Sequence, residues 1–154
     1  MRILFDSKNP QHKLPFGCLT PGESCVLRLH IPSAVATRGA EIVLCGADGQ
    51  EFSKADMRFE KTVGPYEYWS GDFSLAETGL YFYFFRITDP HGTFRLFKEG
   101  DDANMEAGEK WQVSCIPADF YTPSWAQGAV IYQVFPDRFA RSGRCDCTGK
   151  LEPY

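Results

Sequence analysis

The sequence predicts an all-β fold, an immunoglobulin-like antiparallel β-sandwich spanning roughly residues 1–117 of 154. About eight short segments carry alternating or β-branched and aromatic residues, and turn residues separate them. No segment shows the apolar periodicity of an amphipathic helix. Aromatic residues make up 15% of the chain, a content that suits a sandwich core and sugar binding equally.

The first half of the chain predicts four strands. Residues 2–6 can form a short edge strand, and the Pro- and Gly-containing stretch 7–22 predicts a loop. Residues 25–31 alternate between apolar and polar types, as a half-buried strand does. Residues 41–45 predict a strand that ends in an Ala-Asp-Gly turn, and residues 50–61 carry the next one.

Four more strands follow. Residues 66–73 and 80–87 are expected as strands, and the second has apolar residues on both faces apart from one arginine. An Asp-Pro-His-Gly turn then predicts a hairpin with residues 93–97. Residues 99–108 are acidic and predict a loop, and residues 110–116 form the last expected strand.

Period-2 alternation also predicts which side chains share an apolar face. These are Cys25, Leu27, Leu29, Ile31, Met57, Phe59, Trp111, Val113 and Cys115.

The end of the sequence has a different character. Residues 118–126 contain a proline that excludes a continuous helix, and we expect a linker there. Residues 129–135 form a short apolar run that is interrupted only by Gln133 and stopped by Pro136. Such a run predicts a strand buried on both faces, as in parallel sheets covered by helices. Because no crossover helix follows before Tyr154, we expect residues 127–154 to be the start of a mostly absent domain.

This run, with the residues after it, resembles the first barrel strand of the alpha-amylase family of glycoside hydrolases. The resemblance is strongest to its neopullulanase, cyclomaltodextrinase and maltogenic-amylase group. Upstream, Pro123-Ser124-Trp125, the segment 14–17, and strands 26–29 and 80–84 also resemble that group. The barrel-strand motif consists of Tyr132, Gln133, Phe135, Pro136, Asp137, Arg138 and Phe139, in a continuous stretch that begins at Ile131.

The resemblance implies an enzyme that hydrolyses α-glucosidic bonds in maltooligosaccharides, cyclodextrins or pullulan with retention. Its catalytic carboxylates would lie on later barrel strands, so we expect no catalytic residue and no activity in this chain alone. The extra N-terminal domain of that group commonly helps to form a homodimer and narrows the substrate cleft. Asp137 and Arg138 are read as a buried ion pair between barrel strands, with direct substrate contact as the alternative.

The sandwich could instead bind carbohydrate or serve a purely structural role. Tyr66, Tyr68 and Trp69 are candidates for stacking on sugar rings, beside Glu67 and Asp72. The competing interpretation, that alternating aromatics fill the core, is favoured. The three histidines are scattered and receive no catalytic role.

Composition narrows the remaining possibilities. A formal net charge of −4 argues against a nucleic-acid partner, and no run of 18 apolar residues suggests a membrane span. Without a signal peptide we expect a cytoplasmic protein with six reduced, mostly buried cysteines. The Cys145/Cys147 pair has too few partners for zinc, and the loop 140–147 has one carboxylate, too few for calcium. We therefore expect no metal and no cofactor.

Overall fold

The computed structural model describes residues 2–100, 102–105, 108–133 and 135. Within these residues the strands are β1 (Lys13–Leu14), β2 (Ser24–Pro32), β3 (Gly39–Cys45), β4 (Glu51–Val63), β5 (Tyr66–Ser74), β6 (Gly79–Asp89), β7 (Gly92–Glu99), β8 (Asp102–Met105) and β9 (Trp111–Cys115). A 3₁₀ turn, η1 (Ser33–Val35), follows β2. The expected strands from residue 25 onward are therefore confirmed up to β9.

The expectations for two loops and one edge strand were wrong. Residues 2–6 form no strand, and Leu4 alone makes a bridge to His30. Strands β1 and β8 form inside the stretches expected as loops. β1 has only two residues and therefore shows no alternation, and β8 lies in an acidic stretch. Both are strands because of their neighbours: β1 pairs with β2, and β8 pairs with β7.

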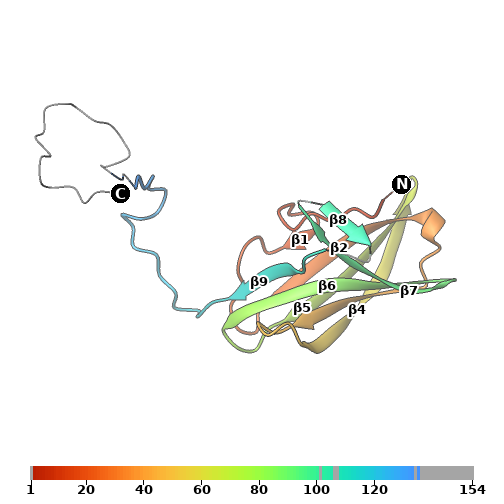
Figure 1. Ribbon diagram of the computed structural model, residues 1–154, viewed down its shortest axis with the longest axis horizontal. Coiled ribbons are helices and arrows are strands. Elements are labelled where there is room, and N and C mark those ends of the chain that lie inside the picture. Colours follow the sequence, from red (N-terminus) through yellow and green to blue (C-terminus); the bar gives the residue numbers. More distant parts are fainter. Residues whose placement is uncertain (1, 101, 106–107, 134, 136–154) are drawn as a thin grey trace, which may run out of the picture. The chain divides into compact units, whose positions relative to one another are not determined.

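All strand pairs are antiparallel, and their order is β1-β2-β5-β4-β3-β6-β7-β8, with β9 paired to β6. The first part of β4 pairs with β3 and the second part with β5, and the β4–β5 register shifts between Phe59 and Lys61. The sheet therefore curls through β4, and this path can be followed by colour in Figure 1. The all-β antiparallel prediction is confirmed; the division into two immunoglobulin-like sheets stays a prediction.

The inner face of the curled sheet buries an aromatic cluster. The Phe5 ring packs edge-on against Phe85 at 4.8 Å and Trp111 at 5.0 Å, and Tyr83 stacks on Trp111 at 5.9 Å. The predicted apolar face is buried except at Phe59, which is 51% exposed. Phe59 lies at the register shift of β4, and its ring makes an edge contact with Trp69.

The chain divides into two units, Met1–Phe120 and Tyr121–Tyr154. The division falls inside the stretch 118–126 that the sequence predicts as a linker; the domain limits themselves stay a prediction. No helix in the described part of the chain is both long and apolar enough to cross a membrane.

Candidate functional site

The barrel-strand motif is described only in part. Tyr132, Gln133 and Phe135 are solvent-exposed, and the described residues around them form no strand. Pro136, Asp137, Arg138 and Phe139 lie outside the described residues. A strand requires a hydrogen-bonded neighbour, and none of the described strands pairs with the described part of the motif. The expected barrel strand is therefore not confirmed.

The three candidate sugar-stacking residues lie on β5 but not on one face. Trp69 points into the core and is 8% exposed, and its Nε1–H donates to a Glu67 carboxylate oxygen at 3.1 Å. Tyr68 lies on the other side of the strand, because successive side chains of a strand alternate between its faces. Its ring packs against His30 at 3.9 Å, and the Lys61 ammonium lies 5.5 Å from the ring centroid.

Tyr66 is half-buried at the start of β5, opposite Val63 of β4. Tyr66 and Tyr68 therefore lie on one face of the strand, where Tyr68 already packs against His30, and Trp69 lies on the opposite face. These residues do not form one aromatic platform.

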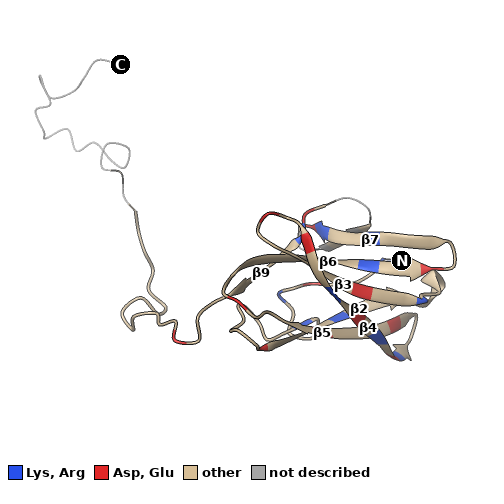
Figure 2. Cartoon of the chain, turned by 90° about the horizontal axis from the view of Figure 1, so that it is seen from below, with Lys and Arg blue, Asp and Glu red and all other residues tan. Residues whose placement is uncertain are grey.

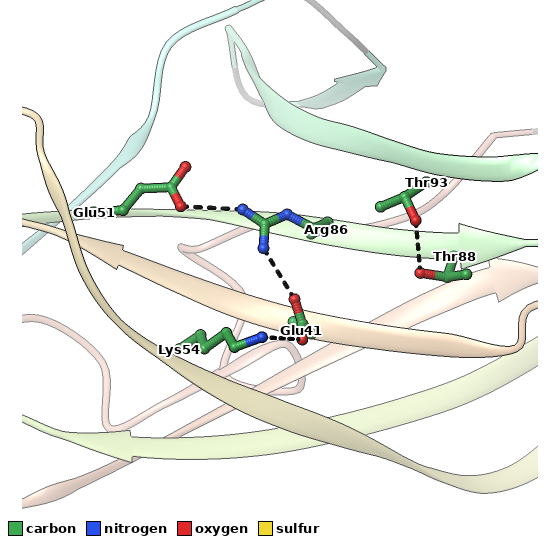
Figure 3. A network of polar contacts seen from close by, with 6 residues as sticks. All are labelled: Glu41, Glu51, Lys54, Arg86, Thr88 and Thr93. Atoms are coloured by element: carbon green, nitrogen blue, oxygen red, sulfur yellow. Dashed lines mark hydrogen bonds and ion pairs between the residues drawn. The ribbon is translucent and has the colours of Figure 1, made fainter.

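The outer face of β3, β4 and β6 carries a polar network (Figure 3). Glu41 of β3 lies opposite Arg86 of β6 in the sheet register. Its two carboxylate oxygens accept hydrogen bonds from the Lys54 ammonium at 3.0 Å and the Arg86 guanidinium at 3.2 Å. The same guanidinium donates to Glu51 at 3.1 Å. Charges of both signs are interspersed along these strands (Figure 2).

This network limits the chemistry that Glu41 can perform. The hydrogen bond from Lys54, followed by the charges of Lys54 and Arg86, lowers the pKa of the Glu41 carboxyl despite partial burial. The carboxylate is thus held ionised and has both oxygens occupied. A general acid in glycoside hydrolysis needs the opposite, a carboxyl whose pKa is raised. We conclude that Glu41 and its partners tie strands together.

Next to the network lies a polar groove of about 420 Å³. Its polar lining residues include Arg38, Glu41, Asp56, Arg86, Thr88 and Thr93. Thr88 and Thr93, paired across the β6–β7 hairpin, share a hydroxyl hydrogen bond of 3.0 Å.

A different feature is the segment of residues 13–17, which comprises β1 and the residues after it and displays two apolar side chains. Lys13 is 4% exposed, and its ammonium group donates to the backbone oxygens of Pro15 at 2.9 Å and Gly17 at 2.7 Å. These bonds to one buried cation brace the loop from inside. Leu14 and Phe16, in contrast, are 50% and 67% exposed. We call residues 13–17 the braced loop.

The braced loop is only weakly indicated by the sequence. Residues 14–17 entered the resemblance as a segment, but no pattern indicated that Lys13 is buried. A lysine between a histidine and a leucine is ordinarily a surface residue. A buried lysine that binds loop carbonyls is visible only once the loop's path is known.

The described cysteines are free, and most of them are buried. Cys25, Cys45 and Cys115 are free and buried, as expected, whereas free Cys18 is exposed. Burial raises the pKa of the Cys25 thiol to about 11, so this thiol is inert near neutral pH. Within the described ranges, no three His, Cys, Asp or Glu side chains gather in a way that could hold a metal ion. Cys145 and Cys147 lie outside those ranges.

Comparison with known proteins points to glycosidases. An amylopullulanase of Thermoanaerobacterium saccharolyticum is 27% identical over 143 residues, which are 87% of this chain and 11% of that enzyme. Neopullulanase 2 of Thermoactinomyces vulgaris is 43% identical over 61 residues, 38% of this chain and 10% of that protein. The chain thus spans about a tenth of the length of these curated relatives. These low-identity matches support a relationship to alpha-amylase-family glycosidases.

A solved structure supports the fold alone. An uncharacterized protein from Listeria monocytogenes superposes with a TM-score of 0.50 and 14% identity, covering 70% of this chain and 9% of that one. No known family profile matches the sequence.

Proposed function

We propose that this chain is the N-terminal β domain of an alpha-amylase-family glycoside hydrolase, followed by the start of its catalytic barrel. One observation carries the proposal: relatives named amylopullulanase align with 87% of this chain but with only about a tenth of their own length. A module of larger enzymes would show this relationship. The immunoglobulin-like sandwich and the barrel strand of the sequence prediction belong to the same proposal.

The parent enzyme would cleave α-glucosidic bonds in maltooligosaccharides, cyclodextrins or pullulan. Retaining hydrolysis uses two carboxylates about 5–5.5 Å apart on either side of the scissile bond. Glu41, a carboxylate beside the polar groove, is held ionised in ion pairs with Lys54 and Arg86. The catalytic carboxylates would therefore come from the rest of the barrel, and the β domain would have an accessory role.

The accessory role that we favour is homodimerisation, with shaping of the partner's substrate cleft. The braced loop supports this role, because it holds Leu14 and Phe16 in water at a fixed position. Pre-organised apolar side chains favour association, since little conformational entropy is lost when they become buried.

The runner-up role is carbohydrate binding through β5. It has weaker support because Trp69 is buried and Tyr68 is already stacked on His30. Calorimetric titration of the chain with maltoheptaose and β-cyclodextrin tests it. Saturable binding that is lost in Tyr66→Ala would favour this role over dimerisation.

Sedimentation velocity tests the dimer role. We expect Phe16→Ser to weaken self-association of the chain, because it removes an exposed aromatic from the braced loop. Phe59→Ser is the matched control, since Phe59 is also about half exposed but lies on β4. If both variants associate as the unchanged chain does, the braced loop is not the contact.

A further inference from the structure

The N-terminal segment, residues 2–6, completes the core without forming a strand. Ile3 and Phe5 are buried at 5% and 3% exposure. Leu4 bridges β2 through two backbone hydrogen bonds with His30, of 2.9 and 3.1 Å. A cavity of about 160 Å³ beside the segment is lined by residues 2–6, His12 and Ala103 of β8. The segment thus lies beside both β2 and β8, which are far apart in the strand order.

His12 fastens this segment from the loop before β1. Its Nδ1 accepts a hydrogen bond of 2.8 Å from the backbone N–H of Asp6. Its ring stacks on Phe5 at 6.0 Å and meets the His30 ring edge-on at 4.7 Å. Because Nδ1 accepts a hydrogen bond, it carries no proton. The ring is therefore neutral, with its proton on Nε2.

Protonation cannot leave this arrangement intact. An imidazolium carries N–H groups at both nitrogens, so it has no acceptor for the Asp6 N–H. The new charge would also be buried beside a second histidine. We propose that His12 is a pH-sensitive latch: its neutral form holds residues 2–6 against the core, and its protonated form releases them.

The surrounding charges set the direction of the effect. Desolvation lowers the pKa of His12, and the opposing attraction of Asp6 is smaller. Desolvation and then the charge of His12 lower the pKa of His30, against Glu60 on β4. Lys13, the next residue, directs its ammonium to Pro15 and Gly17.

His30 also packs against the Tyr68 ring at 3.9 Å, and the Lys61 ammonium lies over that ring. The backbone N–H of Arg28, on β2, donates a hydrogen bond to the His12 carbonyl. This contact ties His12 to the sheet and does not titrate.

The direction of the pH effect follows from the linkage between proton binding and stability. A folded-state pKa below the ordinary histidine value of about 6.5 means that the unfolded or released form binds the proton more tightly. The latch is therefore fully closed above about pH 6.5 and weakens as the pH falls through the folded-state pKa. Each unit of separation between the two pKa values corresponds to roughly a tenfold change in the closed-to-open ratio.

Hydrogen exchange measures the latch directly. Exchange of the Asp6 amide, corrected for the intrinsic pH dependence, is compared at pH 7.5 and pH 5 in the whole chain. We expect protection to fall several-fold at pH 5 in the unchanged chain. In His12→Gln, whose side-chain oxygen can accept the same hydrogen bond without titrating, protection should be independent of pH. His91→Gln, at an exposed turn, should behave as the unchanged chain does.

Equal protection of Asp6 at both pH values in the unchanged chain would overturn the proposal. So would a His12→Gln protein that keeps the full pH response. If His12→Gln does not fold, NMR titration of the unchanged chain decides the question. The proposal requires the Asp6 amide shift to follow the His12 imidazole titration with the same midpoint, and separate midpoints contradict it.

Discussion

Lys13 is buried, and its ammonium group donates hydrogen bonds to two loop carbonyls. Burying a charge is costly unless it is hydrogen-bonded, so this geometry ties the course of residues 13–17 to one side chain. The braced loop and its two exposed apolar residues depend on that tie.

Replacing Lys13 with methionine keeps the length of the side chain but removes both hydrogen bonds. We expect a loss of about 1–3 kcal/mol in unfolding free energy, the usual cost of leaving partly buried acceptors unpaired. Urea denaturation measures it. Lys54→Met, which removes the exposed ion pair with Glu41, should cost about 1 kcal/mol or less. Equal losses in the two variants would mean that Lys13 does not brace the loop.

The burial of apolar residues on β2 and β9 was predicted correctly, because alternation along a strand determines which face each side chain lies on. Leu27, Leu29 and Trp111 are buried as their pattern requires. For Tyr66, Tyr68 and Trp69, the sequence left sugar stacking and core packing open, with core packing favoured. Alternation places Trp69 on the other face of β5, and the structure shows it in the core.

At the scale of elements, β5 shows how tightly the bend of the sheet is packed. Gly71 lies at the middle of β5, opposite Leu27 of β2. A Cβ at this position would lie 2.9 Å from the Met57 side chain, 3.1 Å from the Asp56 carbonyl oxygen and 3.1 Å from Ile42. The glycine therefore lets the β5 backbone approach β3 and β4.

Gly71→Ala should destabilise the domain by about 1–3 kcal/mol, because overpacking displaces a backbone carbonyl as well as side chains. Thermal and urea unfolding followed by circular dichroism provide the measurement. Gly39→Ala on β3 is the control, since an added Cβ there meets nothing within 4 Å. A Gly71→Ala protein as stable as the Gly39→Ala protein would contradict this account of the bend.

Most long strands could be predicted from sequence, and the shortest ones could not. β6 has apolar residues on both faces over most of its length, and β2 alternates cleanly. β1 and β8 have too few residues for a period to show, and they are strands because a neighbouring edge is available. The register shift in β4, where the exposed Phe59 lies, depends on how β4 pairs with β5, which no local pattern encodes.

At the scale of the whole molecule, the β domain should fold without the second unit. The core cluster draws its residues from positions 3–115. Residues 1–120 alone should therefore melt cooperatively, within a few degrees of the whole chain. Differential scanning calorimetry of the two proteins tests this.

The same comparison carries a prediction for association. Val130, Ile131 and Tyr132 are each at least 80% exposed, and burying such a side chain is worth roughly 1.5–3 kcal/mol. Removing residues 121–154 should therefore reduce self-association in sedimentation experiments. A truncated protein that fails to fold would show that the second unit is integral to the β domain.

The relationship to alpha-amylase-family glycosidases was predictable from the resemblance of the motif at residues 131–139, not from the geometry of a site. The described residues offer a strand-tying ion network and a braced loop, and neither feature specifies a glucan. In the proposed parent enzyme, the preferred substrate would depend on pockets that the barrel forms from the ends of many strands.

The intact mass of the native polypeptide that carries this sequence, captured from its source cells with an antibody against residues 1–120, tests the central claim most directly. A (β/α)8 barrel takes about 250 residues, so the proposal predicts a polypeptide several hundred residues long that releases reducing ends from maltoheptaose. A native protein consisting of these 154 residues alone would contradict it.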